Sequence, residues 1–218
     1  MARLCLVSVK STPYVFVGGS TFTYIDENYV GDHLVESLTI PHGCSYFLKD
    51  RITSKEVLNY IKVNNSYEFF VFNYGFGDSS YKIRNKTIYD IFEPWIQSKY
   101  GNLLKIILFV SFIYKPNISL NTFKSNTNKI LQLIPPTSTL IFVLNLPIDV
   151  SLLKRFARNR YSKHLKNILS KYDSTIWKLL DISNYDKSCR SSDSHHLNLK
   201  GAELLKKALE EEFHSKRK

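Results

Sequence analysis

The chain has 218 residues, of which 44% are hydrophobic and 14% aromatic. This length and composition exclude wholesale disorder and favour a single globular domain, residues 1–218, that buries a core of its own. Thirty Lys and Arg against 19 Asp and Glu give a net charge of +11, which favours anionic partners without specifying one.

Apolar runs rich in aromatic and β-branched residues predict strands, and apolar residues that recur at spacings of three and four predict helices. In chain order, the predicted strands are 14–17, 37–40, 67–73, 104–112, 139–145 and 175–182. The predicted helices are 20–37, 53–61, 87–100, 120–134, 150–170 and 199–213. Residues 1–12 are expected to form a short extension or edge strand, and residues 214–218 a basic tail.

Several of these elements carry sequence signals at their ends. Thr53-Ser54-Lys55-Glu56 has the spacing of a capping box, which predicts the start of a helix. Pro94 lies inside the helix predicted over 87–100 and indicates a kink or a break there. A glycine-containing segment at 41–45 predicts a turn.

Apolar strands that alternate with helices of ten to twenty residues predict an α/β fold, a three-layer α/β/α sandwich around a mostly parallel sheet. In such sheets, ligands bind beyond the carboxyl ends of the strands. Ser20, Gly43, the loop 73–78 and the loop 193–196 each follow a predicted strand. We therefore expect these four segments to meet at one edge of the sheet.

Two of these segments carry the residues of a serine hydrolase. Ser20 follows Gly18-Gly19 at the start of a predicted helix, and Asp193 lies three residues before His196 in one loop. A serine hydroxyl is a poor nucleophile until a base removes its proton. His196 would be that base, Asp193 would orient its ring, and the backbone N–H groups of Ser20 and Gly43 would bind a developing oxyanion.

Each motif also has a purely structural interpretation. A Gly-Gly-Ser segment after a strand is often only a tight turn with a helix cap, and Asp193 can cap the approach to the last helix. Adjacent histidines are often only exposed polar residues, and the loop 73–78 can be an ordinary connection. The enzymatic interpretation depends on finding these motifs together at one predicted edge.

The two motifs resemble those of the SGNH/GDSL hydrolase superfamily, and the resemblance covers nearly the whole chain from Tyr14 onward. Val17-Gly18-Gly19-Ser20-Thr21 resembles the first block of the family, and Asp193 to Asn198 resembles its last block, Asp-x-x-His. The resemblance implies a flavodoxin-like sheet. It implies Ser20 as nucleophile, His196 as base, Asp193 as its partner and Gly43 as the second-block glycine.

The third block departs from the family pattern, Gly-x-Asn-Asp, whose asparagine donates to the oxyanion. The nearest match is Gly75-Phe76-Gly77-Asp78, and Asn73 is the candidate replacement donor. Loss of one such donor typically costs about 10²–10³ in rate. Because His195 lies directly before His196, the sequence leaves open which of the two imidazoles is the base. The candidate oxyanion and substrate-binding residues are Gly19, Gly43, Asn73, Gly75 and Asp78.

The resemblance implies a serine-dependent ester hydrolase or acyltransferase that acts through an acyl-enzyme. The expected substrate is a small-molecule or carbohydrate ester with a small acyl group, and the net charge favours an anionic one. The alternative is a catalytically degenerate member of the fold that binds a glycan. We expect no cofactor and no metal, because a zinc site would have to be assembled without a standard zinc motif from His42, Cys44, His195 and His196.

A further alternative, nucleic-acid binding, rests on the basic helix 154–166, in which Phe156 and Tyr161 interleave with cationic residues. No recognised nucleic-acid motif accompanies this charge, so we expect no specific nucleic-acid binding. The cationic residues are Lys154, Arg155, Arg158, Arg160, Lys163 and Lys166.

Cysteine usage and hydropathy bear on the compartment. Cys5, Cys44 and Cys189 are far apart and odd in number, so they suggest neither a disulfide framework nor a CxxC metal pair. The first residues lack the features of a signal peptide, and the longest apolar run, 103–114, is too short to span a bilayer. We expect a cytoplasmic protein without a membrane span, and the sequence leaves its oligomeric state open.

Overall fold

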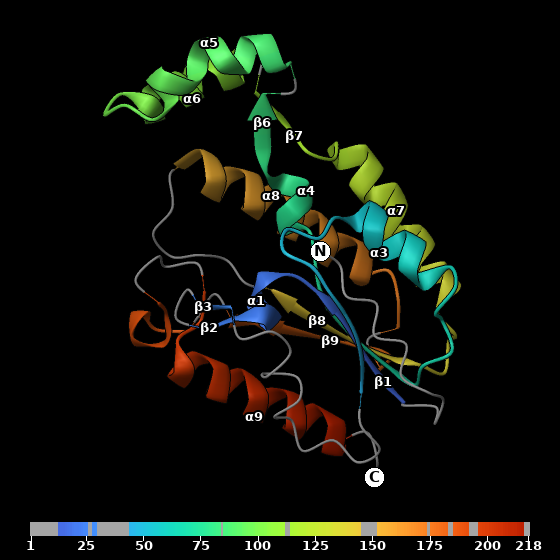
Figure 1. The fold of residues 1–218 in the computed structure, drawn as a ribbon. Coiled ribbons are helices and arrows are strands. Elements are labelled where there is room, and N and C mark those ends of the chain that lie inside the picture. Colours follow the sequence, from blue (N-terminus) through green and yellow to red (C-terminus); the bar gives the residue numbers. More distant parts are fainter. Residues whose placement is uncertain are drawn as a thin grey trace.

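A five-stranded parallel sheet forms the centre of the described structure, in the order β4-β1-β5-β8-β9 (Figure 1). Its strands are β1 (Tyr14–Gly18), β4 (Ser45–Leu48), β5 (Phe69–Asn73), β8 (Thr139–Leu144) and β9 (Trp177–Asp181). The computed structural model describes residues 13–25, 28–29, 44–83, 85–111, 114–144, 152–173, 175–182, 185–191 and 196–215. The predicted α/β class and flavodoxin-like parallel sheet are confirmed.

Helices cover both faces of this sheet (Figure 1). On one face lie α3 (Ser54–Ile61), α7 (Leu120–Leu133) and α8 (Leu152–Leu169), and on the other lies α9 (Leu199–Ser215). Val15 and Val17 of β1 pack in the first core cluster, whereas Tyr14 and Phe16 pack in the second. Because successive side chains of a strand point to opposite faces, burial on both sides explains why β1 is apolar throughout.

The order of the strands places a crevice beside β1. The chain leaves β1 toward β4 and leaves the neighbouring strand β5 toward β8. The connections from these two strands therefore run in opposite directions, which marks the switch point where parallel sheets bind ligands. The register pairs Gly18 with Leu48 of β4 and with Asn73 of β5. The loops that follow these three strands therefore emerge side by side at one edge.

The helix predicted over 20–37 is wrong in its described part. α1 spans only Ser20–Thr23, after which β2 (Tyr24–Ile25) pairs antiparallel with β3 (Asn28–Tyr29). Threonine, isoleucine and aromatic residues favour extended backbone over helix, and here that preference outweighs the helical spacing. Residues 1–12 and the strand predicted over 37–40 lie outside the described residues.

The strand predicted over 104–112 is also wrong, because this segment is helical. α6 (Gly101–Val110) lies beside α5 (Lys86–Ile96), and the ribbon of β6 (Tyr81–Ile83) and β7 (Tyr114–Pro116) joins both helices to the body (Figure 1). A short apolar run fits a strand or a helix equally well. The sheet position beside β5 is taken by β8 instead.

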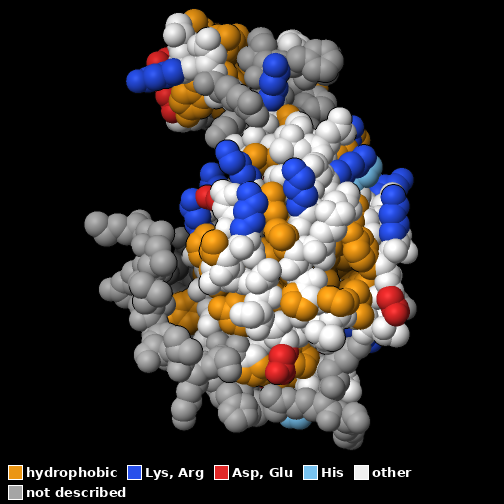
Figure 2. Space-filling view, turned by 90° about the vertical axis from the view of Figure 1, so that its right-hand side faces the viewer, with side chains coloured by type: hydrophobic (Ala, Val, Ile, Leu, Met, Phe, Trp, Pro, Cys, Tyr) orange, Lys and Arg blue, Asp and Glu red, His pale blue; other side chains and the backbone are white. Residues whose placement is uncertain are grey.

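The α5–α6 pair projects from the body and exposes large apolar side chains. Ile91, Trp95 and Leu103 are each at least 60% exposed. Figure 2 shows this lobe above a body on which Lys and Arg side chains gather with few acidic ones between them. Among the described residues, no helix combines the length and the apolar character needed to cross a bilayer.

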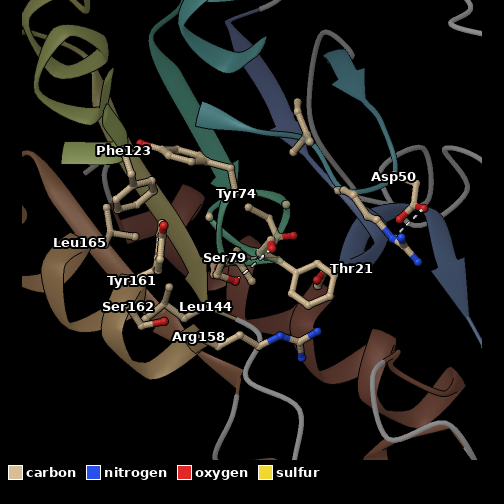
Figure 3. Close-up of a pocket in the computed structure, with 18 of the residues that line it drawn as sticks. Thr21, Asp50, Tyr74, Ser79, Phe123, Leu144, Arg158, Tyr161, Ser162 and Leu165 are labelled. Carbon is tan, nitrogen blue, oxygen red and sulfur yellow. Dashed lines mark hydrogen bonds and ion pairs between the residues drawn. The ribbon is translucent and has the colours of Figure 1, made fainter. Parts of the chain in front are cut away.

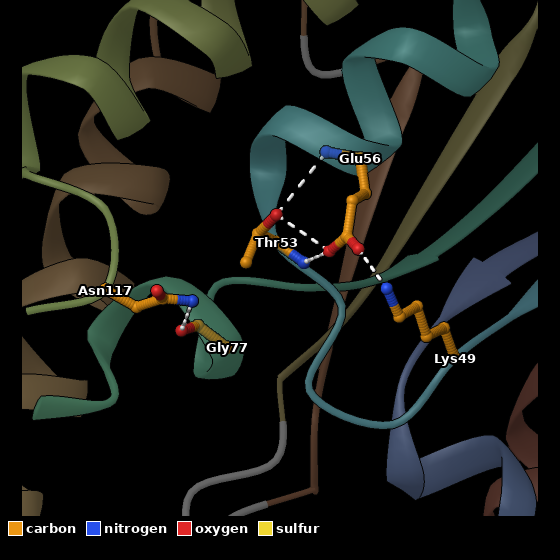
Figure 4. Close-up of polar contacts among 5 residues, drawn as sticks. All are labelled: Lys49, Thr53, Glu56, Gly77 and Asn117. Carbon is orange, nitrogen blue, oxygen red and sulfur yellow. Dashed lines mark hydrogen bonds and ion pairs between the residues drawn. The ribbon is translucent and has the colours of Figure 1, made fainter. Parts of the chain in front are cut away.

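The capping box predicted at Thr53 is confirmed. Thr53 Oγ1 accepts a hydrogen bond from the Glu56 backbone N–H, and the Thr53 N–H donates to Glu56 Oε2 at 2.9 Å (Figure 4). Lys49 donates to the second oxygen of the same carboxylate. Burial raises the pKa of Glu56, but the hydrogen bonds from Lys49 and Thr53 outweigh it and leave that pKa below its ordinary value. These contacts fix the loop between β4 and α3.

Candidate active site

A pocket of about 280 Å³ opens at the carboxyl edge of the sheet (Figure 3). Gly19 and Thr21, the residues on either side of Ser20, line it together with His196 from the loop before α9. The loops after β4 and β5, the end of β8 and the helices α7 and α8 provide the rest of the wall. The two ends of the chain that carry the predicted motifs therefore meet at one pocket.

The predicted catalytic residues are described to different extents. Ser20 is the first residue of α1, and its side chain lies outside the described residues. Asp193, His195 and Gly43 also lie outside them, so the assignment of the three catalytic residues stays a prediction. His196 is described and partly buried, and its backbone carbonyl accepts from the Ser191 N–H at 3.1 Å.

Hydrogen bonds hold the end of β1 between the two neighbouring loops. The Lys49 N–H donates to the Gly18 carbonyl at 3.0 Å, and the Gly19 N–H donates to the Asn73 carbonyl at 3.1 Å. A methyl group built on Gly19 would lie 3.9 Å from the Arg51 amide nitrogen. The loop after β4 thus comes directly against the residue that precedes Ser20.

This loop, residues 49–53, forms a wall of the pocket through Asp50, Arg51 and Ile52. Arg51 has a φ of 51°, a left-handed conformation that glycine adopts easily and that costs another residue about 1 kcal/mol. Gly43 was the expected second-block glycine, but its described neighbour Cys44 lies at the amino end of β4. The sequence interpretation missed the loop because it assigned a turn where β4 begins.

The loop predicted over 73–78 contains a short helix, α4 (Phe76–Ser79). Gly75 precedes it with a φ of 103°, so the turn from β5 into α4 requires a residue without a Cβ. The Gly77 carbonyl accepts a hydrogen bond from Asn117 Nδ2 at 3.3 Å (Figure 4). Gly75, Phe76 and Gly77 all line the pocket.

The sequence matches no protein-family model and no curated protein. Among solved structures, it is similar to the lipase Lip_vut3 from a goat rumen metagenome (14% identity, TM-score 0.57, 90% of this chain and 94% of the other). It is also similar to a GDSL-like lipase from Bacteroides thetaiotaomicron (12%, 0.55, 95% and 91%). A third is the catalytic domain of the peptidoglycan O-acetyltransferase OatA from Streptococcus pneumoniae, solved with a methylsulfonyl adduct (10%, 0.52, 88% and 87%).

The chain has the SGNH/GDSL hydrolase fold. The likeness covers most of each chain, and it confirms the resemblance that the two sequence motifs indicated. At these identities the likeness shows the fold alone, so the chemistry has to be argued from the residues of the pocket.

The SGNH/GDSL pattern is broken at Gly77 for a reason that lies in the packing. A Cβ on Gly77 would lie 2.1 Å from the Arg51 carbonyl oxygen and 2.5 Å from that of Ile52. Two backbone carbonyls therefore occupy the space that a side chain at this position would need. The close approach between the loop 49–53 and α4 thus leaves no room for a side-chain amide at position 77.

Asn73, the candidate replacement donor, lies at the end of β5 and lines the pocket. Its Nδ2 donates to the Val143 carbonyl at 2.8 Å, which uses one of the two amide hydrogens. The second hydrogen makes Asn73 the remaining side-chain amide donor among the candidate residues.

Asp78 does not line the pocket, and its carboxylate is fully buried against the start of α3. Its Oδ2 accepts from the Ser54 N–H at 2.8 Å, and its Oδ1 accepts from the Ser54 hydroxyl at 2.6 Å. Asn126 Nδ2 donates to the same hydroxyl at 3.0 Å. Asp78 therefore joins α4 to α3 and α7, and this geometry favours a positioning role over the predicted contact with substrate.

Burial raises the pKa of Asp78 from 3.8 to about 6, against the opposing effect of the hydrogen bonds from Ser54. A raised pKa means that the folded chain holds this proton more tightly than the unfolded chain. The stability that it contributes is therefore present below about pH 4 and is lost as the pH rises through about 6, by roughly 3 kcal/mol at most. Asp78→Asn cannot titrate and should lack this dependence.

Urea unfolding between pH 4 and 7 measures this effect as the stability of the wild type minus that of Asp78→Asn, which should fall with rising pH. Asp90→Asn, which removes an exposed carboxylate, is the control for the loss of one negative charge. A difference that grows with pH would show that the hydrogen bonds outweigh burial at Asp78.

The helix that was considered for nucleic-acid binding contributes Arg158, Tyr161, Ser162 and Leu165 to the pocket. Arg158 and Tyr161 of α8 are both buried and both line the pocket. Lys166, on the same helix, forms an ion pair with Asp181 at 3.0 Å. The cationic residues of α8 therefore do not form a single exposed face. The spacing from Arg158 to Tyr161 and Leu165, three and seven residues, is the sequence signal that places Arg158 on the buried face.

Of the four residues considered for a zinc site, Cys44 and His196 are described, and His42 and His195 are not. Within the described ranges, no three side chains of His, Cys, Asp or Glu are grouped closely enough to hold a metal ion.

Proposed function

We propose that the chain is a serine esterase or acyltransferase that acts through an acyl-enzyme formed on Ser20. The observation that carries this proposal is the convergence of Gly19, Thr21 and His196 on one pocket at the carboxyl edge of the sheet. Solved structures of the same fold that are described as lipases and as an O-acetyltransferase support the reaction class.

In this mechanism, Ser20 Oγ attacks the ester carbonyl carbon while His196 takes the hydroxyl proton. The tetrahedral intermediate collapses as the bond between carbon and the alcohol oxygen breaks, and His196 gives its proton to the departing alcohol. Water or an acceptor hydroxyl then attacks the acyl-enzyme with His196 as base, and Ser20 is regenerated. Asp193 orients the imidazole and stabilises its charged form.

The oxyanion needs donors that differ from the family set, because Gly77 carries no side-chain amide. The backbone N–H groups of Ser20 and Arg51 and the second N–H of the Asn73 amide are the donors that we assign to it. The contact of the loop 49–53 with Gly19 and the position of Asn73 at the pocket support this assignment.

The substrate that fits this proposal is a small-molecule or carbohydrate ester with a small acyl group. The pocket of about 280 Å³ lies just below the usual range for ligand sites, so it suits a short acyl chain and part of the alcohol. The peptidoglycan O-acetyltransferase with the same fold supports a carbohydrate acceptor.

A second function, glycan binding without catalysis, is favoured by one observation. The carbonyls of Arg51 and Ile52 fill the space beside Gly77, which removes the side-chain donor of the family pattern. In that case the same pocket binds its ligand and no acyl-enzyme forms.

Labelling with methanesulfonyl fluoride separates the two functions. An activated Ser20 should displace fluoride and carry a methylsulfonyl group, which peptide mass spectrometry locates. We expect the adduct in the wild type and in the control Ser170→Ala, none at this position in Ser20→Ala, and slow formation in His196→Ala. A folded wild type that acquires no adduct would favour the binding function, and an adduct elsewhere that forms equally in Ser20→Ala would reject the assignment of Ser20.

A further inference from the structure

Arg158 places a guanidinium group in the candidate pocket. The residue lies on α8 and is only 7% exposed, and its guanidinium carbon is 3.6 Å from the centroid of the Phe76 ring. Phe76 belongs to α4, directly after the strand that ends at Asn73. Figure 3 shows the Arg158 side chain extending from α8 into the pocket on the side of Thr21.

The charge of Arg158 has no anionic partner within the described part of the chain. No described carboxylate lies within ion-pair distance of it, and none of its nitrogens donates to a described acceptor, so the Phe76 ring is its one described partner. Arg190, the other buried arginine among the described residues, differs because its Nη2 donates to the Ile182 carbonyl. Arg158 is thus stacked on Phe76 at the pocket, and its N–H groups meet no acceptor among the described residues.

Such an arrangement is costly unless a ligand completes it. Burying a charge without a counter-charge or hydrogen bonds is strongly unfavourable, and a cation–π contact offsets only part of that cost. Burial lowers the pKa of Arg158 to about 9, which still leaves the group charged at neutral pH. The planar guanidinium presents several N–H donors in a fork that matches a carboxylate or a phosphate.

We propose that Arg158, stacked on Phe76, is the anion-binding residue of this pocket and selects ligands that carry a carboxylate or a phosphate group. As a statement about substrates this rests on the proposed function, because it places the anionic group on the ester that Ser20 would attack. Gly19, Thr21, His196 and Arg158 line one pocket of about 280 Å³, so a single small molecule can meet both the reacting segment and the guanidinium.

Calorimetric titration tests the anion site without requiring catalysis. The probes are 4-hydroxybenzoate, 4-hydroxyphenyl phosphate and the neutral methyl 4-hydroxybenzoate, at constant ionic strength. We expect the wild type to bind an anionic probe more tightly than the neutral one, and the tighter anion identifies carboxylate or phosphate as the preferred group. Arg158→Gln should raise the Kd of that anion about 10- to 100-fold, the usual effect of losing a charge-assisted hydrogen bond.

Two further variants keep this test decisive. Arg160→Gln removes an exposed charge from the same helix and should change the Kd by less than about twofold, because exposed charges contribute little. Arg158→Lys keeps the charge and loses the fork, so it should weaken the anion about 3- to 10-fold even if Arg158→Gln does not fold. Equal affinity of the wild type for neutral and anionic probes, or equal losses for both in the Arg158 variants, would overturn the proposal.

Acetyl esters of the same three phenols connect the anion site to turnover. The ratio of kcat/KM for the anionic ester to that for the neutral ester should fall about 10- to 100-fold in Arg158→Gln and stay constant in Arg160→Gln. Loss of anion binding in Arg158→Gln without any turnover by the wild type would support the anion site and reject the proposed esterase activity. Turnover whose selectivity is unchanged in Arg158→Gln would support the enzyme and overturn the anion site.

Discussion

Replacement of Ser20 by alanine is expected to lower the turnover of 4-nitrophenyl acetate by at least about 10³-fold, because it removes the atom that forms the acyl-enzyme. His196→Ala should cause a loss of similar size, since the serine hydroxyl is then left without its base. The variant that carries both substitutions should be no slower than the slower single variant. The two residues act in one step, so removal of either already abolishes the contribution of the other. Initial rates at fixed pH, corrected for the reaction with buffer, measure these losses.

The control for this experiment is Ser170→Ala, which removes an exposed hydroxyl just after α8, away from the pocket-lining residues. Its turnover should equal that of the wild type. Activity that survives Ser20→Ala would instead come from surface lysine or histidine side chains and would reject the catalytic assignment. A folded wild type without turnover that still acquires the methylsulfonyl group on Ser20 would indicate an acyltransferase that needs its own donor.

Restoring the family asparagine by Gly77→Asn is expected to destabilise the protein and to leave the rate no higher. The new Cβ would lie 2.1 Å from the Arg51 carbonyl oxygen, and that contact involves backbone, which cannot rotate away as a side chain would. Either α4 or the loop 49–53 has to move, and overpacking of this kind costs about 3 kcal/mol or more. Urea unfolding at neutral pH measures the stability, and the same ester assay measures the rate.

Gly19→Ala is the matched stability control for this substitution. A methyl group on Gly19 meets nothing closer than the Lys49 carbonyl oxygen at 3.5 Å, an ordinary contact, so its free energy of unfolding should change by no more than about 1 kcal/mol. If Gly77→Asn proved as stable as Gly19→Ala and raised kcat about 10²-fold or more, a single missing donor would explain the departure from the family pattern. That result would contradict the packing argument.

Elements with strong local signals were predicted correctly. The capping box at Thr53 starts α3, the apolar run before Asn73 is β5, and the helices predicted over 120–134 and 199–213 appear as α7 and α9. The failures fall where local signals are ambiguous. The apolar run at 104–112 fits a strand or a helix, and in the structure it is helical and packs against α5 and β7.

Two features of the site were visible in the sequence, and the comparison of folds agrees with what they indicated. Ser20 behind a double glycine and the Asp193–His196 pair, at opposite ends of the chain, identified the SGNH/GDSL fold and the reaction to test. Gly19 and Thr21, which flank Ser20, converge with His196 on one pocket. This agrees with the rule that ligands bind at the carboxyl ends of parallel strands.

The walls of the pocket were decided only by the tertiary structure. The loop 49–53 lies against Gly19 because β4 pairs with β1, and it leaves no room for a side chain at Gly77. Arg158 is buried because α8 packs over α4. Each is a contact between segments far apart in the sequence. Periodicity and capping depend on neighbours within one or two turns, so the sequence by itself determined the elements with strong local signals and named the candidate reactive side chains. Which surfaces meet around those side chains depends on how the helices and strands pack together, because a close-packed interior accepts only arrangements without overlaps or voids.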